Sequence, residues 1–278
     1  MPAQRIAENL AFINWTVLTA LAVGAFGAVV LARLRTDATR GFLGFTAACA
    51  VVFGLLALAS DRALPLVLPD SPIAADPAWD IPRRVALAAF CALAAAYVVA
   101  IARRRRAAPL GIAATATGGL VLLFGALGWG GGLLGAVPLL LQLGVLTAAT
   151  GGVFAAMILG HWYLVTPRLS ERPLILFSRL LTAVLGLQLA LFLVWVATGA
   201  GPAGSAPFAI LGGPWALFVW LRLLIGLVFP LIVSWAALQT ARSRSMESAT
   251  GLLYINVGSI AAGTILAAGL YFGAGLLV

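Results

Sequence analysis

Long apolar runs follow one another along almost the whole chain, and only short gaps separate them. Each run has roughly the 20 residues that an α-helix needs to cross a bilayer. A membrane β-barrel would instead show segments of about ten residues with alternating polarity, whereas these runs are continuous. The runs therefore predict an all-α integral membrane protein with eight transmembrane helices. We expect these helices at residues 10–32, 41–60, 85–102, 109–129, 133–160, 173–198, 214–240 and 249–276.

The composition favours the same class of protein. Only 9% of the residues are charged, whereas a soluble domain carries about 25%. Because the eight expected spans leave no room for a separate soluble domain, residues 1–278 are expected to form one polytopic domain. A net charge of +9 would suggest a nucleic-acid partner for a soluble protein. Here the arginines are interpreted as topology signals and lipid contacts, so the expected partner is the bilayer and not nucleic acid.

The positions of the arginines predict the orientation of the chain, because basic loops remain on the cytoplasmic side. Arginines cluster at every second gap, whereas the fourth and sixth gaps hold none. The second gap, at about 61–84, is mixed, since its arginines are accompanied by aspartates. Both termini are therefore expected outside, in a multi-pass protein of the plasma membrane, the inner membrane if the source is bacterial. The clusters are Arg33, Arg35 and Arg40; Arg103 to Arg106; Arg168 and Arg172; and Arg242 and Arg244.

A weak internal repeat divides the chain into two halves of four spans, 1–130 and 131–278. The run Val17–Ala20 in the first span matches Val145–Ala148 in the fifth. Four spans per repeat keep the orientation, so the axis relating the halves would lie along the membrane normal. In the seventh span, Pro230 is expected to kink the helix and to free a backbone carbonyl.

Arg222 is the only ionisable residue that the sequence places deep in an apolar span. Counted from residue 214 at 1.5 Å per residue, it lies roughly 12 Å below the outer boundary. An arginine at such a depth is expected to face the bundle interior, with a partner. The candidate partners in the outer half are Gln188, Gln142 and Asn14. A cation among amides suits a quinone carbonyl, an anionic headgroup or an anionic solute. Alternatively, Arg222 extends past Trp220 to the interface.

A second polar group is expected at the cytoplasmic boundary, around the single histidine of the chain. His161 ends the fifth span, and Glu247, Tyr254 and Arg179 are expected at the same level. A histidine beside a carboxylate could transfer protons to a reduced cofactor. The alternative is an interfacial histidine in an aromatic belt, with Glu247 paired to arginines.

Haem is not favoured as a cofactor, and no metal site is expected. One histidine cannot supply two axial imidazoles, and Met157 lies one turn away on the same helix. The sequence shows no carboxylate inside any expected span, which argues against ion-coupled pumping. It also shows no catalytic motif, so no catalytic residue is assigned.

The function favoured by these features is that of a membrane subunit of a respiratory or redox complex. Such a subunit would bind a quinone or lipid between its helices and anchor partner subunits that carry the redox centres. The eight-span plan in two halves resembles, in architecture, the polysulfide-reductase-type membrane anchors. These use two four-helix bundles and a quinone site near the outer face, and no residue is carried over from them. The alternatives are a small-solute or lipid transporter or permease subunit, and a purely structural membrane subunit.

Overall fold

The computed structural model describes residues 1–65, 71–105, 107–166 and 169–278, and these residues form helices and loops without strands. Eight helices among them are long and apolar enough to cross a membrane. The predicted eight-span, all-helical class is thereby confirmed. Asp70, Arg106 and Arg168 lie outside the described residues.

A short helix, α1 (Pro2–Glu8), precedes the first span. The spans are α2 (Leu10–Arg35), α3 (Arg40–Arg62), α4 (Asp80–Ala102), α5 (Ala108–Trp129), α6 (Leu133–Val165), α7 (Arg172–Thr198), α8 (Ala216–Leu223) continued through η3 (Leu224–Val228) into α9 (Phe229–Arg242), and α10 (Met246–Ala274). Two short 3-10 helices, η1 (Pro77–Trp79) and η2 (Ala209–Leu211), lie in the long loops.

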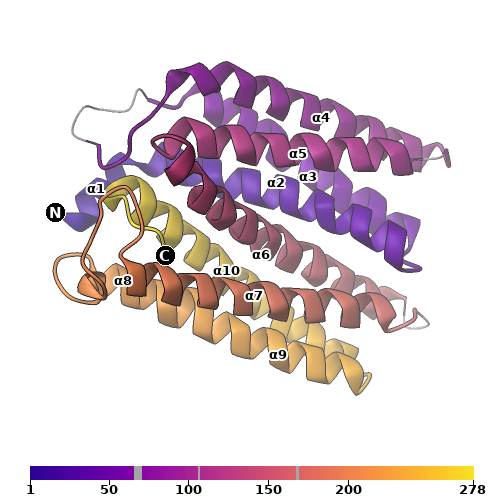
Figure 1. Cartoon of the computed structure of the whole chain (residues 1–278). Coiled ribbons are helices and arrows are strands. Elements are labelled where there is room, and N and C mark those ends of the chain that lie inside the picture. Colours follow the sequence, from indigo (N-terminus) through magenta and orange to yellow (C-terminus); the bar gives the residue numbers. More distant parts are fainter. Residues whose placement is uncertain (66–70, 106, 167–168) are drawn as a thin grey trace.

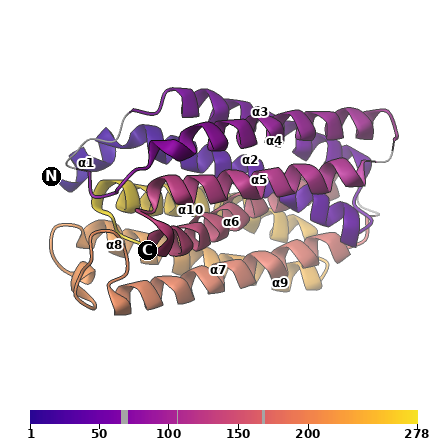
Figure 2. The ribbon, with the colours of Figure 1, turned by 45° about the horizontal axis from the view of Figure 1, so that its top comes forward.

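The spans run side by side along one common direction, and both termini lie at the same end of the bundle (Figures 1 and 2). This end, called here the terminal end, also holds the long loops before α4 and after α7. The opposite end holds the connections next to Arg40, Arg103, Arg172 and Arg244, and is called the basic end. The prediction that the basic end faces the cytoplasm stays a prediction.

The centre of the bundle is the contact between α2 and α6, where the two backbones touch. A Cβ atom built on Gly151 would lie 2.1 Å from the backbone nitrogen of Ala25, and one on Gly24 would lie 2.0 Å from the carbonyl oxygen of Thr147. Only glycine permits such an approach, as in other membrane helix pairs. Because α6 also contacts α5, α7 and α10, this seam joins the four N-terminal spans to the four C-terminal ones. The proposed duplication stays a prediction.

The second gap is shorter than expected, because helix continues through its charged ends. Asp61 lies in the last turn of α3, and Arg83 and Arg84 lie in the first turns of α4. The expectation that these three residues belong to a mixed loop was therefore wrong. Asp76 caps the N-terminus of η1, the short helix before α4, by accepting a hydrogen bond from the backbone N–H of Ala78 at 3.0 Å. The end turns of α3 and α4 can hold these charged residues inside the bundle because their side chains form ion pairs with one another, as described below.

Candidate functional site

The seventh span is interrupted by a π-helical turn, η3, immediately before Pro230. The N–H of Phe229 bonds to the carbonyl oxygen of Leu224, five residues earlier. Proline has no N–H, so Pro230 offers no donor to the carbonyl oxygens of Gly226 and Ile225, four and five residues before it. The sequence predicted one freed carbonyl here, and side chains use both: Arg222 donates to the first and Ser259 to the second.

Arg222 points into the bundle, and only 2% of its surface is exposed. Its Nη2 atom donates to Oε1 of Gln188 at 2.8 Å, and its Nη1 atom donates to the carbonyl oxygen of Gly226 at 3.2 Å. The Nε atom has no partner in the described part of the chain. Arg222 therefore does not extend to the interface, and the acceptors found for it among the described residues are neutral.

Two glycines make room for this guanidinium group. A Cβ atom on Gly263 of α10 would lie 2.9 Å from Nη1 of Arg222, and one on Gly226 would lie 3.1 Å from the same atom. Both distances are too short for a side chain without displacement of the arginine. Arg222 is thus held in a slot between η3 and α10, below the surface of the bundle.

The three amides predicted near Arg222 lie in different surroundings. Gln188 of α7 bonds to Arg222 and also donates from Nε2 to the carbonyl oxygen of Val145 on α6, at 2.9 Å. Gln142, one turn earlier on α6, is 2% exposed, and its Oε1 atom has no partner among the described residues. Asn14 is exposed and donates to Oγ of Ser60 on α3 at 3.3 Å. Asn14 is therefore not part of the hydrogen-bonded pair of Arg222 and Gln188.

A line of buried polar side chains between α9 and α10 extends from this slot, and the sequence did not single it out. Ser259 bonds to the carbonyl oxygen of Ile225, and Asn256 donates to Oγ of Ser234 at 2.7 Å and to the carbonyl oxygen of Pro230 at 3.3 Å. The available signal was the spacing of Asn256 and Ser259, which lie on one face of α10 opposite the proline. These bonds satisfy the backbone carbonyls at the π-turn.

At the basic end, the four predicted proton-transfer residues do not form one group. The hydroxyl of Tyr254 lies 3.3 Å from Nδ1 of His161, and both side chains are exposed. Glu247 lines a separate hollow of about 830 Å³ together with Glu171 and Arg244. Arg179 is exposed on α7. The structure thus brings together His161 and Tyr254, without placing a carboxylate in their hydrogen bond.

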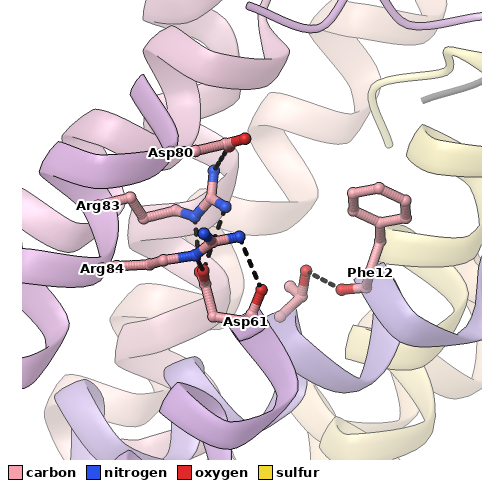
Figure 3. Close-up of polar contacts among 6 residues, drawn as sticks. Phe12, Asp61, Asp80, Arg83 and Arg84 are labelled. Carbon is pink, nitrogen blue, oxygen red and sulfur yellow. Dashed lines mark hydrogen bonds and ion pairs between the residues drawn. The ribbon is translucent and has the colours of Figure 1, made fainter. Parts of the chain in front are cut away.

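At the terminal end, an ion-pair cluster joins α3 to α4 (Figure 3). Arg83 donates from Nε to Oδ2 of Asp61 at 2.7 Å and from Nη1 to Asp80 at 2.9 Å. Arg84 donates from Nε to Oδ1 of Asp61 at 2.6 Å. Asp61 and Arg83 are 0% and 1% exposed, so charged side chains are also buried near the ends of two spans, in addition to Arg222. Both carboxylate oxygens of Asp61 are occupied by arginine donors, which favours a role in holding the helices.

Aromatic rings enclose the same cluster from the other helices. The guanidinium carbon of Arg83 lies 4.5 Å from the ring centroid of Trp129 and 5.7 Å from that of Trp15. The Tyr271 hydroxyl donates to the carbonyl oxygen of Trp129 at 2.7 Å. Such cation–π contacts add to stability when they are shielded from water. The cluster therefore fixes α2, α3, α4, α5 and α10 at one end of the bundle.

The buried Arg222–Gln188 pair and its slot form the candidate site, because its charge lacks a counter-charge in the described structure. No known protein family, curated protein or solved structure matches this chain.

Proposed function

We propose that this protein is a membrane subunit of a redox complex and that it binds the head group of a quinone at Arg222 and Gln188. The observation that carries the proposal is the buried guanidinium group of Arg222, which is bonded to neutral acceptors and keeps an unpartnered Nε. An arginine inside a membrane is costly and marks a ligand or ion pathway more often than a lipid-facing position. A ligand oxygen that carries partial negative charge would offset this cost.

A quinone fits these donors and the medium around them. Its carbonyl oxygens accept hydrogen bonds and become more negative on reduction, so Arg222 would favour the reduced forms. The Gln188 amide carries both a donor and an acceptor, and thus could bond to either a quinone oxygen or a quinol hydroxyl. The unpartnered Oε1 atom of Gln142, on the α6 turn next to the Val145 carbonyl, supplies a further acceptor in this region.

Electrons would be supplied or accepted by partner subunits that carry redox centres. The role of this chain is then to bind and orient the quinone and to anchor those partners at the membrane, which we propose to be the bacterial inner membrane. The expected native state is a complex, and gentle detergent extraction should retain subunits with iron–sulfur or cytochrome centres.

Binding of a photoreactive azido-benzoquinone to the protein in lipid nanodiscs tests the proposal. We expect labelling of peptides from α7 and the seventh span, with competition by unlabelled benzoquinone. In Arg222→Gln, the affinity should fall about 10- to 100-fold, because a hydrogen bond to a charged group contributes about 1.5–3 kcal/mol. Arg222→Lys should recover part of the loss, since it retains the charge.

The matched control is Arg62→Gln, which removes an exposed arginine at the terminal end. It should leave labelling unchanged. Equal affinity in the native protein and in a folded Arg222→Gln variant would overturn the assignment of Arg222. Labelling by a photoreactive phospholipid at the same peptides, without competition by benzoquinone, would instead indicate a lipid site.

A further inference from the structure

An apolar groove lies between α2, α6 and α7, in the membrane-spanning part of the bundle. Its volume is about 320 Å³. Small residues of α2 and α6 form one side, with Gly27, Gly144 and Gly152 among them, and larger side chains of α7 form the other, with Phe177 and Val184 among them. Thr147 is the one polar side chain in the described lining. The chemistry of the groove is therefore that of a hydrocarbon site.

Helix packing does not require three of the four glycines that line the groove. A Cβ atom built on Gly27, Gly144 or Gly152 would meet no heavy atom within 4 Å. Gly24 and Gly151 differ, since their Cβ atoms would clash with the facing backbone. Gly27, Gly144 and Gly152 therefore leave space in the groove, whereas Gly24, which also lines it, and Gly151 allow α2 and α6 to touch.

One end of the groove approaches the candidate site. Val184, at the edge of the lining, lies one helical turn from Gln188 on α7. Gly144 lies next to Val145, whose carbonyl oxygen accepts the hydrogen bond from Gln188. Gln142 lies two residues before Gly144 on α6, and its buried Oε1 atom has no partner among the described residues. A polar head group at Gln188 and an apolar chain in the groove would thus be contiguous.

We infer that this groove holds the first part of the isoprenoid tail of the quinone, a role that rests on the function proposed above. From Val184 to Phe177 the lining extends seven residues along α7, or about 10 Å. This length accommodates the isoprene units nearest the ring and leaves the remainder of a long tail in the bilayer. The tail then runs from Gln188 towards the basic end, and the glycines set the width available to it.

The test compares two probes: a benzoquinone without a side chain and the same benzoquinone with two isoprene units. Each is measured in nanodiscs by competition with the azido-benzoquinone. In Gly27→Leu, the leucine side chain fills the groove, so the affinity for the tailed quinone should fall at least tenfold. The affinity for the tailless quinone should stay within twofold of the native value. Gly144→Leu provides a second variant should Gly27→Leu fail to fold.

The matched controls are Gly119→Leu on α5 and Gly258→Leu on α10. Both glycines are exposed and also have no heavy atom within 4 Å of a built Cβ, but they lie outside the groove. Both controls should bind the two quinones as the native protein does. This comparison removes the effect of adding a leucine to a lipid-facing helix.

The outcomes separate the two proposals. If the native protein binds the tailless quinone and folded groove variants bind both quinones with native affinity, the groove assignment is overturned and the head-group site stands. If the groove variants lose a co-purifying phospholipid but keep the tailed quinone, the occupant is an acyl chain and the inference is wrong. If the native protein binds neither quinone, both proposals fail.

Discussion

Gly226 and Gly263 bring the backbones of η3 and α10 into direct contact, since a Cβ atom on Gly263 would lie 2.6 Å from the Cα atom of Gly226. The same contact positions Arg222, because its Nη1 atom lies beside both glycines and bonds to the Gly226 carbonyl oxygen. Pro230 leaves that carbonyl without its helical donor. The π-turn, the proline and the two glycines thus act together to hold one cation inside an apolar bundle.

Gly263→Ala should therefore destabilise the protein by about 1–3 kcal/mol, the usual cost of overpacking a well-packed core. The methyl group meets the backbone of Gly226 and the guanidinium group of Arg222, neither of which can move without losing contacts. Thermal unfolding in detergent measures the effect. Gly258→Ala on the same helix is the control, because its methyl group meets open space. Equal unfolding temperatures of the two variants would contradict the close approach.

Gln188→Glu should keep the fold and weaken quinone binding. The new carboxylate would lie beside Arg222 and supply the counter-charge that the described structure lacks, so a ligand oxygen would gain less from the guanidinium group. We expect more than a tenfold loss of affinity in the azido-benzoquinone competition assay. Gln4→Glu, a change to an exposed glutamine in α1, controls for the added negative charge. A folded Gln188→Glu variant with native affinity would show that Arg222 does not attract the ligand by its charge.

Asp61→Asn should destabilise the terminal end by up to about 3–5 kcal/mol, because the buried guanidinium group of Arg83 then keeps only the partly exposed Asp80 as a carboxylate partner in the described structure. Replacing both partners, as in Asp61→Leu with Arg83→Met, should cost less than Asp61→Asn alone, since no buried charge is then left unpaired. Unfolding of the single and double variants in detergent gives the comparison. Additive losses from the two sites would argue against the pairing.

Glu171 should respond to pH through its contacts at the basic end. A hydrogen bond from its own backbone, followed by the Arg244 side chain, lowers the pKa of Glu171 below its ordinary value of 4.5. A lowered pKa in the folded state means that the ionised form stabilises the fold above the unfolded pKa. This contribution is lost as the pH falls through the lowered value.

The chain has three glutamates, so a carbon-detected NMR titration can follow Glu171 individually. Arg244→Gln should raise the pKa of Glu171 towards 4.5 without reaching it, because the backbone hydrogen bond remains. Arg242→Gln removes a neighbouring arginine that makes no contact with Glu171 in the described structure, and should leave its titration unchanged. A titration curve that is identical in Arg244→Gln and the native protein would contradict the ion pair.

The spans could be predicted because the bilayer fixes their length and polarity, so each apolar run corresponds to one helix. The Arg222–Gln188 pair could be anticipated from depth alone, since both residues were counted into the outer half. Depth does not define the direction in which a side chain points, however. Asn14 has a suitable depth but faces outward towards Ser60.

The ion pair between Asp61 and Arg83 could not be predicted from hydropathy. Charged residues at the ends of apolar runs look like loop residues, although several spans continue through them, as α2 does through Arg33 and Arg35. Arg83 lies 22 positions away from Asp61 in the sequence and meets it only when α3 and α4 pack side by side. The freed carbonyl at Pro230 was predictable because the missing N–H is a local property of proline.

The Asp61–Arg83 pair also has a consequence for biogenesis. If the basic end is cytoplasmic, the loop between α3 and α4 must be translocated across the membrane together with both charges. Each charge alone opposes passage through hydrocarbon, whereas the bonded pair carries no net charge. We therefore expect α3 and α4 to leave the insertion machinery together as a hairpin. On this view α3 reaches its final depth in the membrane only after α4 has been inserted.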